Sequence, residues 1–203
     1  MRGLRAAAIW ALVVCAIAVP LIFAAFSPQL AWRQPVYIAA GFAGIVGLAL
    51  MLLQPLLAGG ILPGLPTGRG RRVHRWVGGA LVVAVVLHVG FLWITSPPDV
   101  VDVVLFRSPT PFSVWGAVAM WAIFAAAALA ALRKRLHLAP RIFRRAHSAL
   151  VSVAVVGTVV HALLIQGTME TVSKVLLCVF VVAATGKVIF DLRAWKPRAP
   201  RNP

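Results

Sequence analysis

Four of the five histidines are the residues best placed to do chemistry in this sequence. His74 and His88 are 14 residues apart, and His147 and His161 repeat that spacing. In an α-helix, 14 residues return a side chain to nearly the same face, with the two positions roughly 21 Å apart along the axis. An imidazole nitrogen is a good axial ligand for heme iron, and two imidazoles complete its axial coordination. The spacing therefore predicts two metal-binding levels on one pair of helices.

More ordinary interpretations exist for each histidine. A single histidine inside a membrane often forms a hydrogen bond to a neighbouring helix, and a histidine beside arginines at a helix start is common at the membrane surface. Polar groups inside a membrane are nevertheless costly and usually functional. The repeated spacing therefore favours heme ligation for the set. His137 belongs to neither pair and is expected to be solvated in a basic loop.

The composition indicates a polytopic membrane protein. The chain is 62% hydrophobic and has 20 Lys and Arg against four acidic residues. A soluble basic protein would need a polar surface that this sequence lacks, so nucleic-acid binding is excluded. Six stretches are long and apolar enough to cross a bilayer of about 30 Å. They are Ala6–Phe26, Val36–Leu57, His74–Thr95, Ser113–Leu132, His147–Ile165 and Thr171–Ile189.

Connecting loops are expected at the stretches rich in Pro and Gly, 59–70 and 96–111. The first apolar stretch is longer than the core of a signal peptide and lacks a clean cleavage site, so a retained helix is favoured over a signal peptide. Cys15 and Cys178 lie in apolar stretches and are interpreted as small buried side chains.

Positive charge predicts the orientation. All but three of the 20 cations lie at the N-terminus, in the second and fourth loops, or at the C-terminal end; the exceptions are Arg33, Arg107 and Lys174. Lys and Arg are enriched on the cytoplasmic side, so both termini are expected there. The third and fifth helices then run in the same direction. This places His74 level with His147 near the cytoplasmic face, and His88 level with His161 in the outer leaflet. A pairing of His74 with His161 would require antiparallel helices.

Residues flanking the histidines fit a heme. Gly78 and Gly157 each lie one turn from a histidine toward the membrane centre, where a side chain would collide with a porphyrin. Basic residues beside the cytoplasmic pair are candidates for charge-assisted hydrogen bonds to heme propionates. These are Arg72, Arg75, Arg144 and Arg145.

Two segments carry a resemblance to a known family: RRVHRWVGGALVVAVVLHVGFLW and IFRRAHSALVSVAVVGTVVHALL, supported by PFSVWGAVAMWAIF. With the six predicted helices, these segments resemble the ferric reductase-like transmembrane domain over about Val36–Ile189. That superfamily includes ferric reductases, NADPH oxidases and the MsrQ-like membrane subunit of bacterial methionine sulfoxide reductase. The resemblance implies that His74, His88, His147 and His161 are the axial ligands of two b-type hemes, in the pairs His74/His147 and His88/His161.

Departures from the family refine this expectation. Ferric reductases and NADPH oxidases carry a flavin and nicotinamide module after the last helix, whereas no glycine-rich dinucleotide loop is found here. We therefore expect flavin, if used, on a separate cytoplasmic flavoprotein, or a quinone as the donor. MsrQ-like subunits often lack a histidine at the position of His74, so the complete set favours a generic diheme member.

The sequence therefore predicts an all-α fold. Residues 1–195 form one six-helix transmembrane heme-binding domain, and residues 196–203 form a short basic cytoplasmic tail. The expected function is electron transfer through two b-type hemes to an acceptor outside the cytoplasm, such as ferric iron, oxygen or a periplasmic partner, in a bacterial inner membrane. Met169 and Glu170, in a short outer loop, could meet that acceptor. Two alternatives remain: a subunit of a periplasmic methionine sulfoxide reductase system, or a transporter or scaffold without heme.

Overall fold

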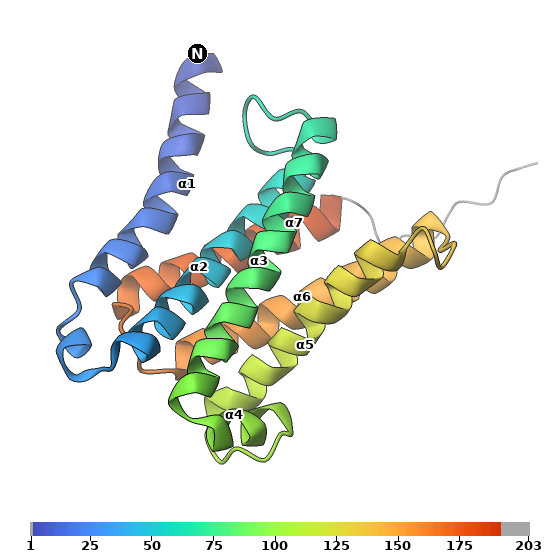
Figure 1. Cartoon of the computed structure of the whole chain (residues 1–203). Helices are drawn as coiled ribbons and strands as arrows, with labels where there is room; N and C mark the ends of the chain where they lie inside the picture. Colours follow the sequence, from blue (N-terminus) through green and yellow to red (C-terminus); the bar gives the residue numbers. More distant parts are fainter. Residues whose placement is uncertain (1, 192–203) are drawn as a thin grey trace, which may run out of the picture.

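The computed structural model describes residues 2–191, so the predicted tail lies outside the described residues. Within that range every element of secondary structure is a helix (Figure 1). The elements are α1 (Arg2–Ala25), η1 (Pro28–Trp32), α2 (Pro35–Ala58), α3 (Thr67–Thr95), α4 (Pro97–Val104), α5 (Pro111–Leu132), α6 (Pro140–Leu164) and α7 (Thr171–Asp191).

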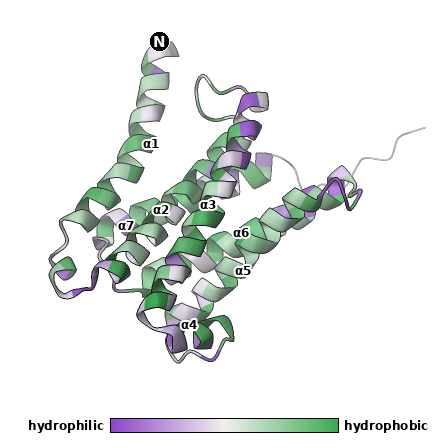
Figure 2. Ribbon diagram, viewed as in Figure 1, coloured by the Kyte–Doolittle hydropathy of each residue, from purple (hydrophilic) through white to green (hydrophobic). Residues whose placement is uncertain are grey.

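Among the described residues, six helices are long and apolar enough to cross a membrane: α1, α2, α3, α5, α6 and α7. Large apolar side chains cover their outer surfaces, as a lipid environment requires. Figure 2 shows the hydrophobic colour along the middle of the helices, and hydrophilic residues at the start of α3 and at the turn between α5 and α6. The predicted six-helix transmembrane bundle is confirmed, and the protein is an integral membrane protein.

Proline sets where many of the helices begin. Proline occupies the first turn of α2, α4, α5 and α6, where its missing N–H is no loss. The predicted starts of the two histidine helices at His74 and His147 were wrong by about two turns, since α3 begins at Thr67 and α6 at Pro140. Hydropathy detects only the apolar part of a helix, whereas arginine also favours helix. His74 and His147 are each the eighth residue of their helix.

The predicted loop at 96–111 contains a short helix, α4, which corrects that prediction. Pro97 and Pro98 start it, and Asp99 lies in its first turn. A negative charge there interacts favourably with the helix dipole and stabilises the helix. The segment was interpreted as a loop because proline breaks the interior of a helix. Proline is tolerated in the first turn, however, and both prolines lie there.

Two hairpins make up the site-bearing part of the bundle. α2 packs along α3, and α5 packs along α6, while α7 contacts both α2 and α6 (Figure 1). α1 lies at the edge, against α2 and α7. The main buried cluster joins side chains from α2, α3, α5, α6 and α7, among them Leu52, Leu81, Ile123, Val155 and Val181, and Ala16 and Ile17 of α1 pack against it. Contacts between α3 and α5 are sparse compared with those inside each hairpin, so the two hairpins can hold a group between them.

Candidate functional site

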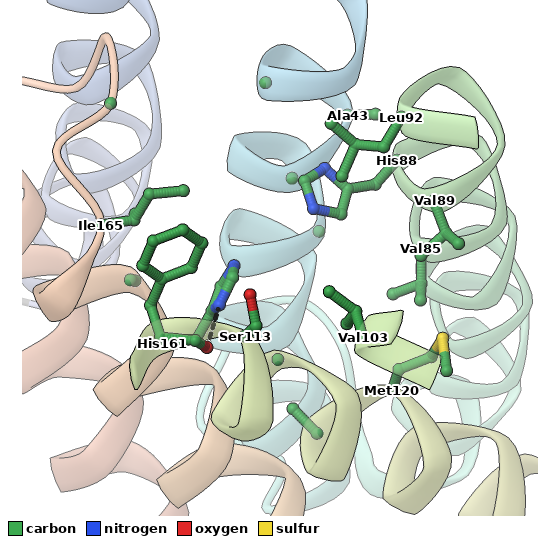
Figure 3. Close-up of a pocket in the computed structure, with 18 of the residues that line it drawn as sticks. Ala43, Val85, His88, Val89, Leu92, Val103, Ser113, Met120, His161 and Ile165 are labelled. Atoms are coloured by element: carbon green, nitrogen blue, oxygen red, sulfur yellow. Dashed lines mark hydrogen bonds between the residues drawn. The ribbon is translucent and has the colours of Figure 1, made fainter. Parts of the chain in front are cut away.

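His88 of α3 and His161 of α6 meet between the two hairpins. Their ring centroids are 6.4 Å apart, and the ring planes are nearly perpendicular, at 80°. A metal ion bound by both imidazoles, with metal–nitrogen bonds of about 2 Å, would place the ring centroids roughly 6 Å apart. The separation of the two rings therefore suits one metal ion between them. Both side chains project toward the same space in Figure 3.

Backbone carbonyls of the neighbouring helices fix both rings. His88 Nδ1 lies 2.7 Å from the carbonyl oxygen of Ala40 in α2, and His161 Nδ1 lies 2.8 Å from that of Phe112 in α5. A carbonyl oxygen can only accept a hydrogen bond, so Nδ1 carries the proton in each ring. Nε2 then keeps its lone pair, which is the state that binds a metal, and the hydrogen bond makes the ligand more basic.

Two glycines that the sequence reading did not select make these contacts possible. A Cβ at Gly44 would lie 3.1 Å from His88 Nδ1, and one at Gly116 would lie 2.8 Å from His161 Nδ1. A side chain at Gly116 would force the His161 ring or the backbone to shift, and one at Gly44 would require the His88 ring to move by a few tenths of an ångström. Each glycine lies four residues after the carbonyl that holds the same histidine, one helical turn away. Because every residue has a backbone carbonyl, no pattern in the sequence marks these two glycines; their role follows from the packing of each hairpin.

A cavity of about 490 Å³ opens beside this pair, within the roughly 300–1,000 Å³ of ligand and cofactor sites. Its lining draws on α2 to α6 and on the segment leading into α7. The wall is largely apolar, with Val85, Val89 and Met120 among the side chains in Figure 3. Such a wall excludes water from a flat apolar cofactor.

The second pair, His74 and His147, is supported differently. His74 Nδ1 lies 3.1 Å from the carbonyl oxygen of Gln54, and the Gln54 side chain donates to the carbonyl of His74 at 3.4 Å. His147 lies near His74, close enough for their charges to interact, and near the carbonyl of Ala126. Yet His147 Nδ1 is buried and has no hydrogen bond of good geometry to any described residue. Phe143 stacks on the His147 ring, with centroids 5.4 Å apart.

The two hairpins repeat one arrangement. In α2, Gln54 follows Ala40 by 14 residues, and in α5, Ala126 follows Phe112 by the same interval. Each helix thus offers carbonyls at the same spacing as the histidines on its partner. Because His88 lies near His161 and His74 lies near His147, α3 and α6 run in the same direction. The structure therefore brings His161 to His88, as expected for parallel helices, rather than to His74.

The glycines selected from the sequence face elsewhere. A Cβ at Gly157 would lie 2.9 Å from the carbonyl oxygen of Trp115, so this glycine lets α6 approach α5 closely. Its expected role beside a porphyrin is corrected to helix packing. Gly78 lies beside the Gln54 side chain of α2, with ordinary contact distances for an added Cβ. Both glycines therefore face the partner helix within their own hairpin.

Four arginines remain candidates for the propionates. They are exposed in the first turns of α3 and α6, on either side of the His74–His147 pair: Arg72, Arg75, Arg144 and Arg145. A fifth, Arg133, lies over the Phe143 ring at 4.6 Å. The cationic groups thus surround the end of the bundle where α3 and α6 begin.

Residues near the opposite end form the segment into α7. Met169 lines the cavity, whereas the Glu170 carboxylate accepts hydrogen bonds from the backbone N–H groups of Ser173 and Val172, both at 2.7 Å. These bonds hold the pKa of Glu170 below its ordinary value. Glu170 therefore stabilises the start of α7. His137 is exposed, in a left-handed backbone conformation, and apart from both pairs.

The residues at the His88–His161 pair fit a b-type heme. They provide two imidazole rings with centroids 6.4 Å apart, both oriented by carbonyls at Nδ1, and an apolar cavity beside them. The His74–His147 pair offers the same ligand chemistry with fewer supporting contacts. Two imidazoles without a third ligand suit a heme, whose porphyrin supplies the remaining donors.

Comparison with known proteins agrees with this geometry. Residues 43–158 match the family described as ferric reductase like transmembrane component. That match includes three of the four paired histidines, and His161 lies just beyond its end. No curated protein and no solved structure matches the chain. The match covers more than half of the sequence, and the chain therefore belongs to the ferric reductase-like transmembrane family, as a membrane component of an oxidoreductase.

Proposed function

We propose that this chain conducts electrons across the membrane through two b-type hemes, one held by His74 with His147 and one by His88 with His161. A heme with two imidazole ligands supplies one-electron chemistry without exchanging ligands. The observation that carries the proposal is the meeting of the His88 and His161 rings, 6.4 Å apart, beside an apolar cavity.

The chain's own residues hold, orient and shield the cofactors. The carbonyls of Ala40 and Phe112 keep the Nδ1 protons of His88 and His161 in place, so that Nε2 faces the space between the hairpins. The apolar wall lowers the local dielectric and keeps water from the metal. The arginines around the His74–His147 pair supply positive charge for propionates.

The direction of transfer follows from the charge distribution. The basic end of the bundle, where α3 and α6 begin, faces the cytoplasm by the distribution of Lys and Arg. Electrons then enter near the His74–His147 pair from a separate flavoprotein or quinone and leave near the His88–His161 pair. The acceptor outside is ferric iron, oxygen or a periplasmic redox partner, in a bacterial inner membrane.

Heme quantitation tests the proposal directly. The purified wild-type chain should contain about two hemes with the sharp α band of reduced b-type heme, and His88→Ala and His147→Ala should each lose one. His137→Asn is the matched control, since His137 lies outside both pairs and Asn tolerates its backbone conformation. If both alanine variants keep full heme content, the ligand assignment is wrong. A colourless wild type after expression with ample heme would reject the redox role and favour a transporter or scaffold.

A further inference from the structure

The cavity wall contains a buried lysine that the proposed function does not use. Lys174, near the start of α7, is only 7% exposed and lines the cavity together with His161. Its ammonium donates one hydrogen bond, of 3.0 Å, to the carbonyl oxygen of Ile165. An ammonium has three N–H donors, so this contact leaves two of them for another partner.

No carboxylate of the described residues forms an ion pair with Lys174. Within residues 2–191 the ion pair is Lys187–Asp191, at the other end of α7. Glu170 is in the preceding turn, and its charge is near enough to interact with that of Lys174, but its carboxylate accepts hydrogen bonds from the backbone of α7 and forms no ion pair with the ammonium. The exposed Asp99 and the half-buried Asp102 of α4 line the cavity as well, but neither forms an ion pair with Lys174.

A structural role accounts for only part of this arrangement. Ile165 follows the last residue of α6, so the ammonium serves as a cap for free carbonyls and lies at the favourable end of the helix dipole. A carbonyl satisfies one donor but leaves the full positive charge in a site of low dielectric. A buried charge without a partner is unfavourable, and more so inside a membrane protein. An anionic occupant of the cavity would supply the close ion-pair partner that the described residues do not.

We propose that Lys174 binds a carboxylate carried by a molecule in this cavity, beside the His88–His161 pair. The inference rests on the proposed function, because it takes the cavity to be a redox site. Two molecules could supply the carboxylate: the heme, through a propionate, or an anionic electron acceptor that enters the same cavity. The shared chemistry is one ammonium–carboxylate pair in an apolar setting, which is stronger than a neutral hydrogen bond.

The first experiment compares heme with its dimethyl ester, which lacks carboxylates. Each is bound to the purified full-length chain in detergent and followed by the low-spin ferric signal of the His88–His161 pair. Wild type should prefer heme about tenfold, the value of one charged hydrogen bond. Lys174→Met should bind both equally, and Lys174→Arg should keep part of the preference. Because the preference is a ratio within one variant, a general loss of stability cancels. Lys187→Met, an exposed lysine of the same helix, is the control and should match wild type.

The second experiment tests the anionic acceptor. Ferric citrate is added to the reduced protein, and reoxidation is followed against its concentration. If heme and ester bind alike in wild type but Lys174→Met needs about tenfold more ferric citrate, the acceptor supplies the carboxylate. If Lys174→Met matches wild type in both experiments, whatever its melting temperature, Lys174 is a helix cap alone and the inference is overturned. A wild type without heme would instead be a failure of the proposed function.

Discussion

His88 and His161 each donate a hydrogen bond to a carbonyl of the adjacent helix, whereas in the His74–His147 pair only His74 does so among residues 2–191. The His88–His161 pair also borders a cavity with an apolar wall. Neither His74 nor His147 lines this cavity. Positive charge is distributed differently: four exposed arginines flank the second pair, whereas the cationic residues that line the cavity beside the first pair are the half-buried Arg33 and the buried Lys174. The same ligand type is thus held by buried polar contacts at one end and surrounded by solvated charge at the other.

The difference teaches how one pair of helices can offer two unlike sites. A hydrogen bond from Nδ1 to a carbonyl raises the basicity of Nε2 and restricts ring rotation. Two such bonds make the His88–His161 pair the more rigid, better prepared ligand set. The His74–His147 pair keeps one ring less constrained, near the basic surface expected to meet an electron donor.

The largest expected effect concerns the spectroscopic signature of the rigid pair. Perpendicular imidazole planes give a highly anisotropic low-spin ferric signal, and the His88 and His161 rings lie at 80°. We expect this signal in oxidised wild type, its complete loss in His161→Ala, and its retention in His147→Ala. Electron paramagnetic resonance on the three proteins measures it. Loss of the anisotropic signal in His147→Ala, with retention in His161→Ala, would reverse the assignment of the pairs.

A second expected effect separates ring positioning from ligation. Gly116→Ala places a methyl group 2.8 Å from His161 Nδ1 and must displace the ring from the Phe112 carbonyl. Loss of such a supporting contact lowers metal affinity by about 10- to 100-fold. A Cβ at Gly44 would lie 3.1 Å from His88 Nδ1, so Gly44→Ala should lower the heme affinity less than Gly116→Ala does. Heme titration of both variants measures this.

Gly90→Ala is the matched control for these substitutions. Gly90 is a helical glycine of α3, two residues from His88, and an added Cβ meets nothing within 4 Å. It should bind heme like wild type and gain slightly in helix stability. Equal affinity in Gly116→Ala and Gly90→Ala would show that the ring can relax and that the glycine is not required.

A third, more moderate effect is the order in which heme leaves. Because His147 Nδ1 has no hydrogen bond of good geometry among the described residues, heme at that pair lacks one supporting contact. A hydrogen bond worth about 1 kcal/mol corresponds to roughly fivefold faster release. Transfer of heme to excess apomyoglobin, followed by absorbance, should show two phases, and His147→Ala should lack the faster one. A missing slow phase in that variant would contradict the comparison.

The smallest expected effect lies outside both pairs, at Glu170. Backbone N–H groups of Ser173 and Val172 hold the pKa of this carboxyl below its ordinary value. The ionised group therefore stabilises the folded state above its ordinary pKa, and this contribution is lost as the pH falls through the lowered pKa. Melting curves at decreasing pH should show a shallower acid decline for Glu170→Gln than for wild type. Parallel curves would exclude a contribution from this cap.

The sequence predicted what depends on local pattern. Six apolar stretches and the 14-residue histidine spacing are periodic features of single helices, and both are visible without knowledge of contacts. The starts of α3 and α6 were misplaced because arginines lower hydropathy while remaining good helix formers. The short helix α4 was missed because its two prolines lie in the first turn, where they are tolerated.

Contacts between helices were beyond prediction from one sequence. Gly157 was assigned to a porphyrin because it shares a face with His161, yet a helix face can border two neighbours, and the Trp115 carbonyl and Ala119 of α5 lie against Gly157. The roles of Gly44 and Gly116 depend on rings that are over 40 residues away in the chain. Such pairings follow from the packing of each hairpin rather than from any periodic pattern.

The contact of His88 with Ala40 and Gly44, repeated by His161 with Phe112 and Gly116, has a use for protein engineers. A designed membrane cytochrome needs each imidazole ring held in one orientation. Polar side chains could hold it, but burying them in lipid is energetically unfavourable. Here each ring is fixed by a hydrogen bond to a backbone carbonyl, and a glycine on the same helix leaves room for the ring. A helix with a glycine at a chosen position, facing a histidine on its hairpin partner, would therefore suffice as a portable ligand holder that adds no polar side chain to the bilayer.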